Sequence, residues 1–242
     1  EIEVDPFRAT ELGVHRYDER LPDGSREGIA NKRRQRAEFL KKLKAIDPSR
    51  LSGGDRVTYV MLESELATAA ASEVCDFHEW TLSARSNPVT TYNYLPELHK
   101  VKSTRDAATL VARYRKIASA IDDRTAALKR GVERKLFAPR ESARRVLEMV
   151  VKQLAQPLDE WPLMKPAMPP KGEWAGGDHQ AFAKEIRDIV QSQIRPALER
   201  YAKVVRDDII PKARDDEHSG LWALPIGKAC YAARVTAFTT LT

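Results

Sequence analysis

The helical spacing of apolar residues is the feature that most constrains this fold. Across residues 104–132 apolar side chains recur three and four positions apart, and similar stripes occupy 140–154 and 182–209. We find no internal repeat and no long segment with the alternation of a half-buried strand. The sequence therefore predicts an all-α fold: an array of long packed helices with an irregular N-terminal segment and at most a short β-hairpin near 222–228.

Capping and turn residues divide the first half of the chain. Residues 1–24 carry several turn signals, and Ser25 precedes a helix expected to run to about Ile46. Asp55 is placed to cap the next helix. The polar and aromatic segment 87–96 is expected to be an irregular connection.

A proline- and glycine-rich segment interrupts the second half. Residues 157–177 are expected to form a surface excursion rather than a domain linker, because helical spacing resumes at once with Asp178 as cap. Pro196 should kink this last long helix, and Pro211 should end it. We therefore expect residues 1–242 to form a single helical unit.

Composition and charge narrow the function classes. Among 242 residues, 42% are apolar and 31% charged, which is too apolar for a disordered chain, and no apolar run is long enough to span a membrane. The net charge of +6 comes from basic residues mostly interleaved with acidic ones. The denser cluster at 32–36 is interpreted as a solvated helix face, since Phe39, Leu40 and Leu43 supply an apolar side, and no nucleic-acid partner is expected.

The two cysteines leave the compartment open. Cys75 and Cys230 either pair or stay reduced, and if reduced each is expected to be a small buried hydrophobe rather than a nucleophile. The chain begins at Glu1 without Met, so an absent signal peptide carries no information.

No complete active site is found among the motifs. His78-Glu79 begins like the zinc motif HExxH, but the fifth position is Leu82, so the second ligand is missing and a structural role is favoured. The other histidines are isolated, and adjacent carboxylate pairs such as Asp122-Asp123 diverge on a helix surface. No metal ligands are assigned in this chain.

Both ends of the chain carry a family resemblance. The segment Thr10-Glu-Leu-Gly-Val-His-Arg-Tyr-Asp-Glu-Arg-Leu-Pro-Asp23 and the tail Gly220-Leu-Trp-Ala-Leu-Pro-Ile-Gly-Lys-Ala-Cys-Tyr231, followed by Phe238-Thr-Thr240, resemble the bacterial DUF885 family (domain of unknown function 885). The resemblance covers nearly the whole chain.

The resemblance implies a longer parent protein of the gluzincin type, a zinc metallopeptidase-like hydrolase of peptide or related amide bonds. Its HExxPGHH-like metal motif lies C-terminal to the Thr-Thr segment, so zinc is implied for the full-length parent and none is bound by this chain. The expected partners are the C-terminal half, as the same polypeptide or a nicked second chain, and a peptide-like substrate. A periplasmic, secreted or lipoprotein-anchored location is implied, with a cytoplasmic one left open.

The resemblance places the tail along a substrate cleft. This chain would form the non-metal wall of the cleft and be inactive alone. The cleft candidates, which offer a tight backbone path or a hydroxyl group, are Gly220, Pro225, Gly227, Tyr231, Thr239 and Thr240. A structural role for each remains an alternative: turn formation, packing or capping.

Two other function classes stay open. A free-standing helical protein-interaction module would use the 161–177 excursion and its two tryptophans. A nucleic-acid-binding domain would use the basic cluster at 32–36 and bind with steep salt dependence.

Overall fold

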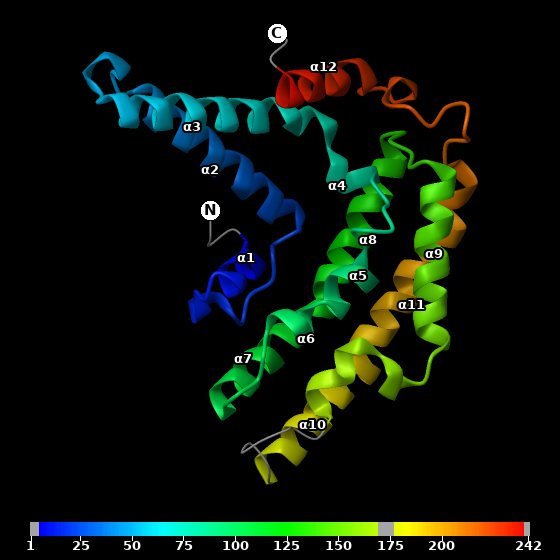
Figure 1. Cartoon of the computed structure of the whole chain (residues 1–242). Helices are drawn as coiled ribbons and strands as arrows, with labels where there is room; N and C mark the ends of the chain where they lie inside the picture. Colours follow the sequence, from blue (N-terminus) through cyan, green and yellow to red (C-terminus); the bar gives the residue numbers. More distant parts are fainter. Residues whose placement is uncertain (1–4, 169–176, 240–242) are drawn as a thin grey trace. The chain divides into compact units, whose positions relative to one another are not determined.

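A computed structural model describes residues 5–168 and 177–239, with the side chains of 177 and 178 excluded (Figure 1). The all-α prediction is confirmed: within the described residues the only β-pairings are two isolated bridges. The α-helices, in chain order, are α1 (Pro6–Glu11), α2 (Arg26–Lys44), α3 (Gly53–Ala71), α4 (Phe77–Trp80), α5 (Pro88–Asn93), α6 (Leu95–Leu98), α7 (Thr104–Tyr114), α8 (Ile117–Glu133), α9 (Arg140–Ala155), α10 (Gly177–Ile189), α11 (Arg195–Val204) and α12 (Gly227–Phe238).

Short 3-10 and π segments join these helices. Their bounds are η1 (His15–Tyr17), η2 (Pro48–Arg50), η3 (Ser72–Cys75), η4 (Leu158–Glu160), η5 (Pro162–Ala167), η6 (Val190–Ile194), η7 (Val205–Ile209), η8 (Ile210–Lys212) and η9 (Leu221–Ala223). Of these, η6 and η7 are π-helical.

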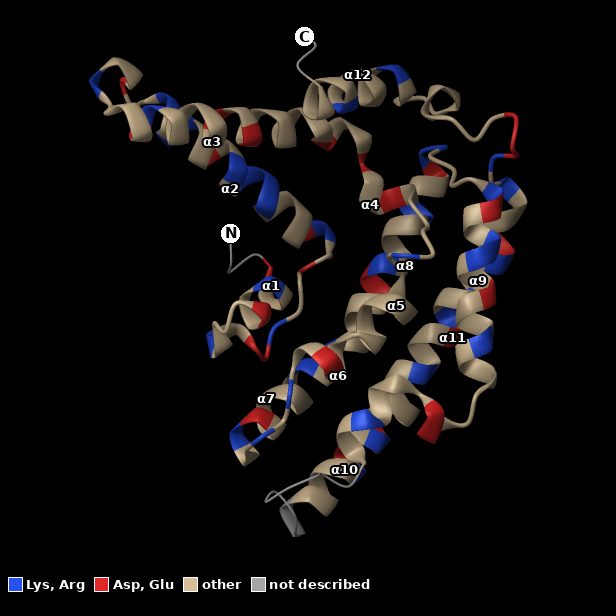
Figure 2. Ribbon diagram, in the orientation of Figure 1, with Lys and Arg blue, Asp and Glu red and all other residues tan. Residues whose placement is uncertain are grey.

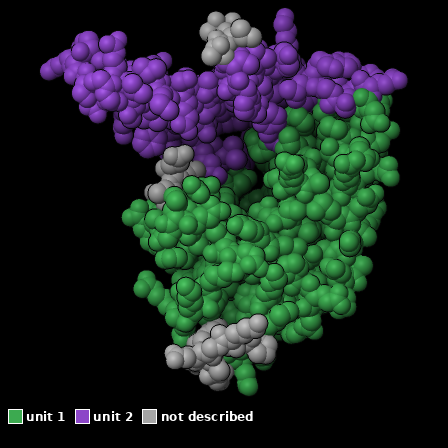
Figure 3. Space-filling model, in the orientation of Figure 1, with its two compact units in different colours: residues 1–25, 78–216 green, residues 26–77, 217–242 purple. Residues whose placement is uncertain are grey.

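The chain divides into two compact units, coloured separately in Figure 3. Unit 1 comprises residues 1–25 and 78–216, and unit 2 comprises residues 26–77 and 217–242. Each unit is described by itself below. That both belong to one helical domain stays a prediction.

Unit 1 contains the large hydrophobic core. Helix α11 packs against α8 and α9, and α10 packs against α7 and η5. The apolar stripe predicted for 104–132 faces this core, with Leu110, Ile117 and Ile121 fully buried. Burying such side chains stabilises the fold by about 1.5–3 kcal/mol each.

Two prolines explain the π segments of the last long helix. Pro196 and Pro211 lack the N–H that a regular helix would donate to the carbonyl four residues earlier. In each case a π segment, η6 or η7, ends two residues before the proline. The kink expected at Pro196 stays a prediction; the structure has a widened, π-helical turn before this residue.

Two sequence expectations about unit 1 are wrong, and a third falls partly outside the described residues. The N-terminal segment is not wholly irregular, because Asp5 caps α1. Residues 88–98 are helical, since Asn87 forms a capping box with Thr90 and Pro88 occupies the first turn. The surface excursion expected at 157–177 stays a prediction, because residues 169–176 lie outside the described part; within 157–168, Trp161 is buried, with 1% of its surface exposed, whereas Asp159 and Glu160 are exposed.

Unit 2 is built on the antiparallel pair α2 and α3. Helix α12 packs on η3 and α3, and η9 packs on α12. Unlike the predicted cap at Asp55, the cap of α3 is Ser52, whose hydroxyl oxygen accepts from the Asp55 N–H at 3.3 Å. The predicted hairpin near 222–228 is replaced by η9 and the start of α12.

Candidate functional site

The loop before α12 has a backbone path that only glycine permits. A Cβ placed on Gly227 would lie 1.9 Å from the carbonyl oxygen of Leu221, a backbone atom that cannot move aside easily. A Cβ on Gly220 would lie 2.5 Å from Nε1 of Trp222, a side-chain atom. Gly227 therefore allows η9 to pack closely against the first turn of α12. This agrees with the tight backbone path that the sequence analysis expected at this glycine.

Backbone hydrogen bonds fix this loop, while Pro225 stays exposed. The N–H of Leu224 donates to Leu221 O at 3.0 Å, and that of Gly227 donates to Leu224 O at 2.8 Å. The Leu224 side chain is buried, with 4% of its surface exposed. The buried Leu224 thus anchors the loop, whereas Trp222 and Pro225 on either side of it remain exposed.

Helix α12 presents an exposed aromatic face. Tyr231 and Phe238, with 63% and 72% of their surfaces exposed, are seven residues apart and so lie on the same side of the helix. The Arg234 guanidinium lies 4.2 Å from the centre of the Phe238 ring. Trp222, 68% exposed, adds a further aromatic side chain from η9.

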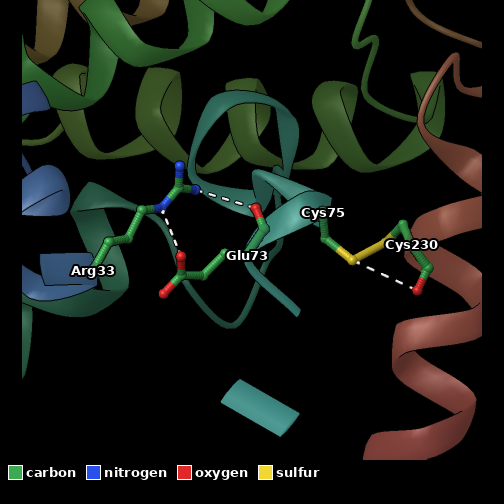
Figure 4. Close-up of a disulfide and its surroundings, with 4 residues drawn as sticks. All are labelled: Arg33, Glu73, Cys75 and Cys230. Carbon is green, nitrogen blue, oxygen red and sulfur yellow. Dashed lines mark hydrogen bonds and ion pairs between the residues drawn. A yellow bond between two sulfur atoms is a disulfide. The ribbon is translucent and has the colours of Figure 1, made fainter. Parts of the chain in front are cut away.

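A disulfide fixes the buried side of α12, next to this aromatic face. Cys230, next to Tyr231, bonds to Cys75 of η3, and both residues are fully buried (Figure 4). The sequence left this pairing open, because 155 residues separate the two positions. The bond holds α12 in place while Tyr231 points outward from the neighbouring position.

The threonine candidates at the end of α12 are only partly described. Thr239 ends the helix, and its hydroxyl donates to Val235 O at 2.7 Å. Thr240 lies outside the described residues. Of the six cleft candidates, Gly220, Pro225, Gly227, Tyr231 and Thr239 therefore belong to one short stretch of unit 2.

The incomplete zinc motif at His78-Glu79 serves packing. Glu79 is buried and forms ion pairs with Arg130, at 3.4 Å, and with Arg134. Gly131 lets the helix carrying these arginines approach closely, since a Cβ there would lie 2.0 Å from Glu79 O. A cluster of three or more His, Cys, Asp or Glu side chains fit to hold a metal is absent from the described residues.

The N-terminal motif builds a buried polar network in unit 1. Asp18 accepts from the Thr10 hydroxyl at 2.6 Å and pairs with His15 at 2.8 Å. The fully buried Arg113 of α7 donates to Thr10 Oγ1 at 3.0 Å and lies 3.7 Å from Asp18. The motif thus ties the N-terminal segment to α7.

Burial shifts the pKa values of this network. It lowers the pKa of the Arg113 guanidinium to about 10, although the Asp18 carboxylate acts in the opposite direction. Burial, and then the positive charge of Arg113, lowers the pKa of His99, whose Nδ1 lies 3.3 Å from Arg113. Sequence reasoning missed this network, because no residue pattern shows that an arginine on a helix will be buried.

A groove of about 400 Å³ lies on unit 1, between α8 and α11. Its charged side chains are paired across the groove: Arg200 binds Asp122 at 2.6 and 3.1 Å, and Lys129 lies 3.9 Å from Asp208. Asp122, from the adjacent carboxylate pair noted in the sequence, and Asp208 thus contribute surface ion pairs.

At least two of the four basic residues at 32–36 form ion pairs within unit 2. Arg33 binds Asp76 at 2.6 Å and Glu73 at 3.6 Å, and Arg36 also pairs with Glu73. Figure 2 shows this basic run on α2, and Figure 4 the pair Arg33–Glu73 beside the disulfide. Phe39, expected to pack, is 57% exposed.

The comparison with protein families agrees with the resemblance seen at both ends of the chain. A search of curated proteins gives no match. No helix in the described part of the chain is long and apolar enough to cross a membrane. The profile of the family described as "Bacterial protein of unknown function (DUF885)" matches residues 6–242. The chain therefore belongs to the DUF885 family.

Proposed function

We propose that this chain is the substrate-facing helical part of a zinc-dependent hydrolase of peptide or related amide bonds. In this proposal it forms the non-metal wall of the cleft and is inactive alone. The observation that carries the proposal is the set of exposed aromatic side chains in one short stretch, Trp222 of η9 with Tyr231 and Phe238 of α12, which Gly227 and the Cys75–Cys230 disulfide hold in place.

The chemistry of this face suits an extended peptide. Aromatic side chains provide apolar contact area with little loss of conformational entropy, and the Tyr231 hydroxyl can donate to a substrate carbonyl or to an oxyanion that develops from it. A rigid support matters because binding groups must be held within about 0.5 Å of the productive geometry.

The described residues do not fit a zinc site. The nearest zinc-like motif, His78-Glu79, lacks its second histidine, and its Glu79 is committed to Arg130 and Arg134. Zinc, which the family resemblance implies, would therefore be held by another part of the polypeptide, which we propose to be the C-terminal half.

The disulfide supports a location where such bonds persist. Disulfides form in oxidising compartments such as the bacterial periplasm and are rare in the cytosol. We therefore propose a periplasmic, secreted or lipoprotein-anchored protein.

The proposal is tested by comparing the complete gene product with residues 1–242. Both are purified, their zinc content is measured by mass spectrometry, and both are assayed on a mixed peptide library. We expect stoichiometric zinc and peptide cleavage from the complete product alone. Full activity from residues 1–242, or a metal-free and inactive complete product, would contradict the proposal.

A second candidate is the helical protein-interaction module. One observation favours it: unit 2 exposes large apolar side chains on α3, among them Val57, Val60 and Met61, each more than half exposed. The expected use of the 161–177 tryptophans is not supported, because Trp161 is buried, and Trp174 lies outside the described residues. Stable, stoichiometric binding of a protein partner by the isolated chain, abolished by Met61→Glu, would favour this candidate.

A further inference from the structure

Unit 2 has a small hydrophobic core of its own. The large core cluster draws its residues from unit 1, whereas the described part of unit 2 buries few large apolar side chains, chiefly Leu43, Tyr59 and Leu224. Units with so little buried apolar surface usually need a covalent or metal staple. In unit 2 the Cys75–Cys230 disulfide is placed to supply it.

The disulfide joins the two separate stretches of chain that form unit 2. Cys75 lies in η3, two residues before the end of the first stretch, and Cys230 lies in α12 of the second. Because 155 residues separate them, the bond removes much of the freedom that these stretches have relative to each other in the unfolded chain. Loss of the bond is therefore expected to weaken the attachment of α12 to the first stretch of unit 2 before it affects other contacts.

Without the disulfide, α2 and α12 differ in the contacts that still attach each of them to unit 2. Helix α2 keeps its ion pairs from Arg33 and Arg36 to Glu73, which are independent of α12. Helix α12 keeps its packing on η3 and α3 and the placement of Arg234 over Phe77, at 5.3 Å. Its large aromatic side chains Tyr231 and Phe238 face solvent and add little to this packing.

We propose that Cys75–Cys230 is a covalent latch on which the attachment of α12 and the preceding loop to η3 depends, so that breaking the bond by reduction releases them while unit 1 stays folded. A dithiol reductant supplies two electrons and two protons: the S–S bond breaks, Cys75 and Cys230 become thiols, and the reductant closes its own disulfide. Both half-cystines are buried, so the reductant reaches them through local opening of unit 2.

The restriction to unit 2 follows from the composition. The chain has 2 cysteines, both in this bond, so unit 1 holds no group that the reductant changes. A consequence that rests on the proposed function is that the face carrying Trp222 and Tyr231 is presented only in the oxidised protein. The latch itself does not depend on that function, and its test uses no activity assay.

The test is hydrogen exchange of the folded protein, followed by mass spectrometry, across a series of dithiothreitol ratios. We expect reduction to raise exchange in peptides covering 220–238 roughly tenfold or more, with peptides in α8 and α9 unchanged. The double variant Cys75→Ser/Cys230→Ser should show the same pattern without reductant and no response to it.

Three outcomes overturn the latch. The first is unchanged protection of α12 after complete reduction, verified by intact mass of the alkylated protein. The second is an equal loss of protection in unit 1. The third is alkylation of Cys75 and Cys230 in the untreated protein after denaturation, which would show that the bond is not formed. Since wild-type protein is reduced after folding, the test does not rely on the variant reaching its native state.

Discussion

The buried network around Arg113 gives the sharpest stability prediction. Its guanidinium is fully buried and donates to Arg20 O at 2.9 Å, Tyr17 O at 3.1 Å and Thr10 Oγ1 at 3.0 Å. Arg113→Met keeps most of the side-chain volume but leaves these acceptors and the buried Asp18 carboxylate without their cation.

The size of the expected loss in unfolding free energy follows from the burial of the ion pair. Removing one member of a buried, hydrogen-bonded ion pair costs about 3–5 kcal/mol, because the remaining charge stays desolvated. The matched control is Arg200→Met, which removes two hydrogen bonds to Asp122. This pair is exposed: 53% of the Arg200 side chain and 45% of the Asp122 side chain are accessible to solvent. Solvent-exposed pairs contribute about 0–1 kcal/mol.

The assay is urea unfolding followed by circular dichroism and by tryptophan fluorescence, to which the buried Trp80 and Trp161 of unit 1 contribute. We expect the free energy of unfolding to fall by about 3–5 kcal/mol for Arg113→Met and by less than about 1 kcal/mol for Arg200→Met. Adding Asp18→Asn to Arg113→Met should recover part of the loss, as coupled neighbours do. Equal losses in the two single variants would refute the reasoning.

Three further predictions test local features. Burial lowers the pKa of folded His99 below 6.5, so the unfolded chain binds a proton at a higher pH than the folded chain, and the free energy of unfolding falls as the pH drops below 6.5. Measured by urea unfolding and compared with His99→Gln, the wild-type chain should lose up to about 1.4 kcal/mol of unfolding free energy per pH unit. Parallel pH profiles of the two proteins would contradict this. Gly227→Ala should cost about 1–3 kcal/mol in unit 2, measured by hydrogen exchange, whereas Gly54→Ala, with open space around its Cβ, should cost nothing; equal effects would contradict the close approach. Tyr201→Phe removes a buried hydroxyl that has no hydrogen-bond partner among the described residues, so the melting temperature should stay equal or rise, and a clear fall would reveal a partner.

The sequence predicts the parts of the fold that local rules control. Helix α9 and the helical stripe at 104–132 follow from apolar spacing, although that spacing does not show the turn at 115–116 that separates α7 from α8. The irregular turn before Pro196 follows from the missing N–H. Helix α5 was missed although its signal is present: Asn87, Pro88 and Thr90 occupy the cap, first and third positions of a capping box. Its polar and aromatic composition outweighed that signal in the interpretation.

Other features depend on three-dimensional neighbours. The Cys75–Cys230 pairing needs two stretches 155 residues apart to meet, and the burial of Arg113 needs the N-terminal segment to cover α7. The candidate site shows the same division. The need for glycine at position 227 was expected from the turn, whereas the rigid support of Tyr231 through its neighbour Cys230 was not.

The most direct test of the proposed function compares Tyr231→Phe with Tyr94→Phe in the complete gene product. Tyr94 is the matched control, because it is also an exposed tyrosine, with 53% of its surface accessible, but lies in unit 1. For peptide hydrolysis we expect Tyr231→Phe to lower kcat/KM by roughly 10-fold or more, as loss of a donor to a developing oxyanion does, with Tyr94→Phe unchanged. Equal kcat/KM values for the two variants would contradict a substrate-facing role for α12.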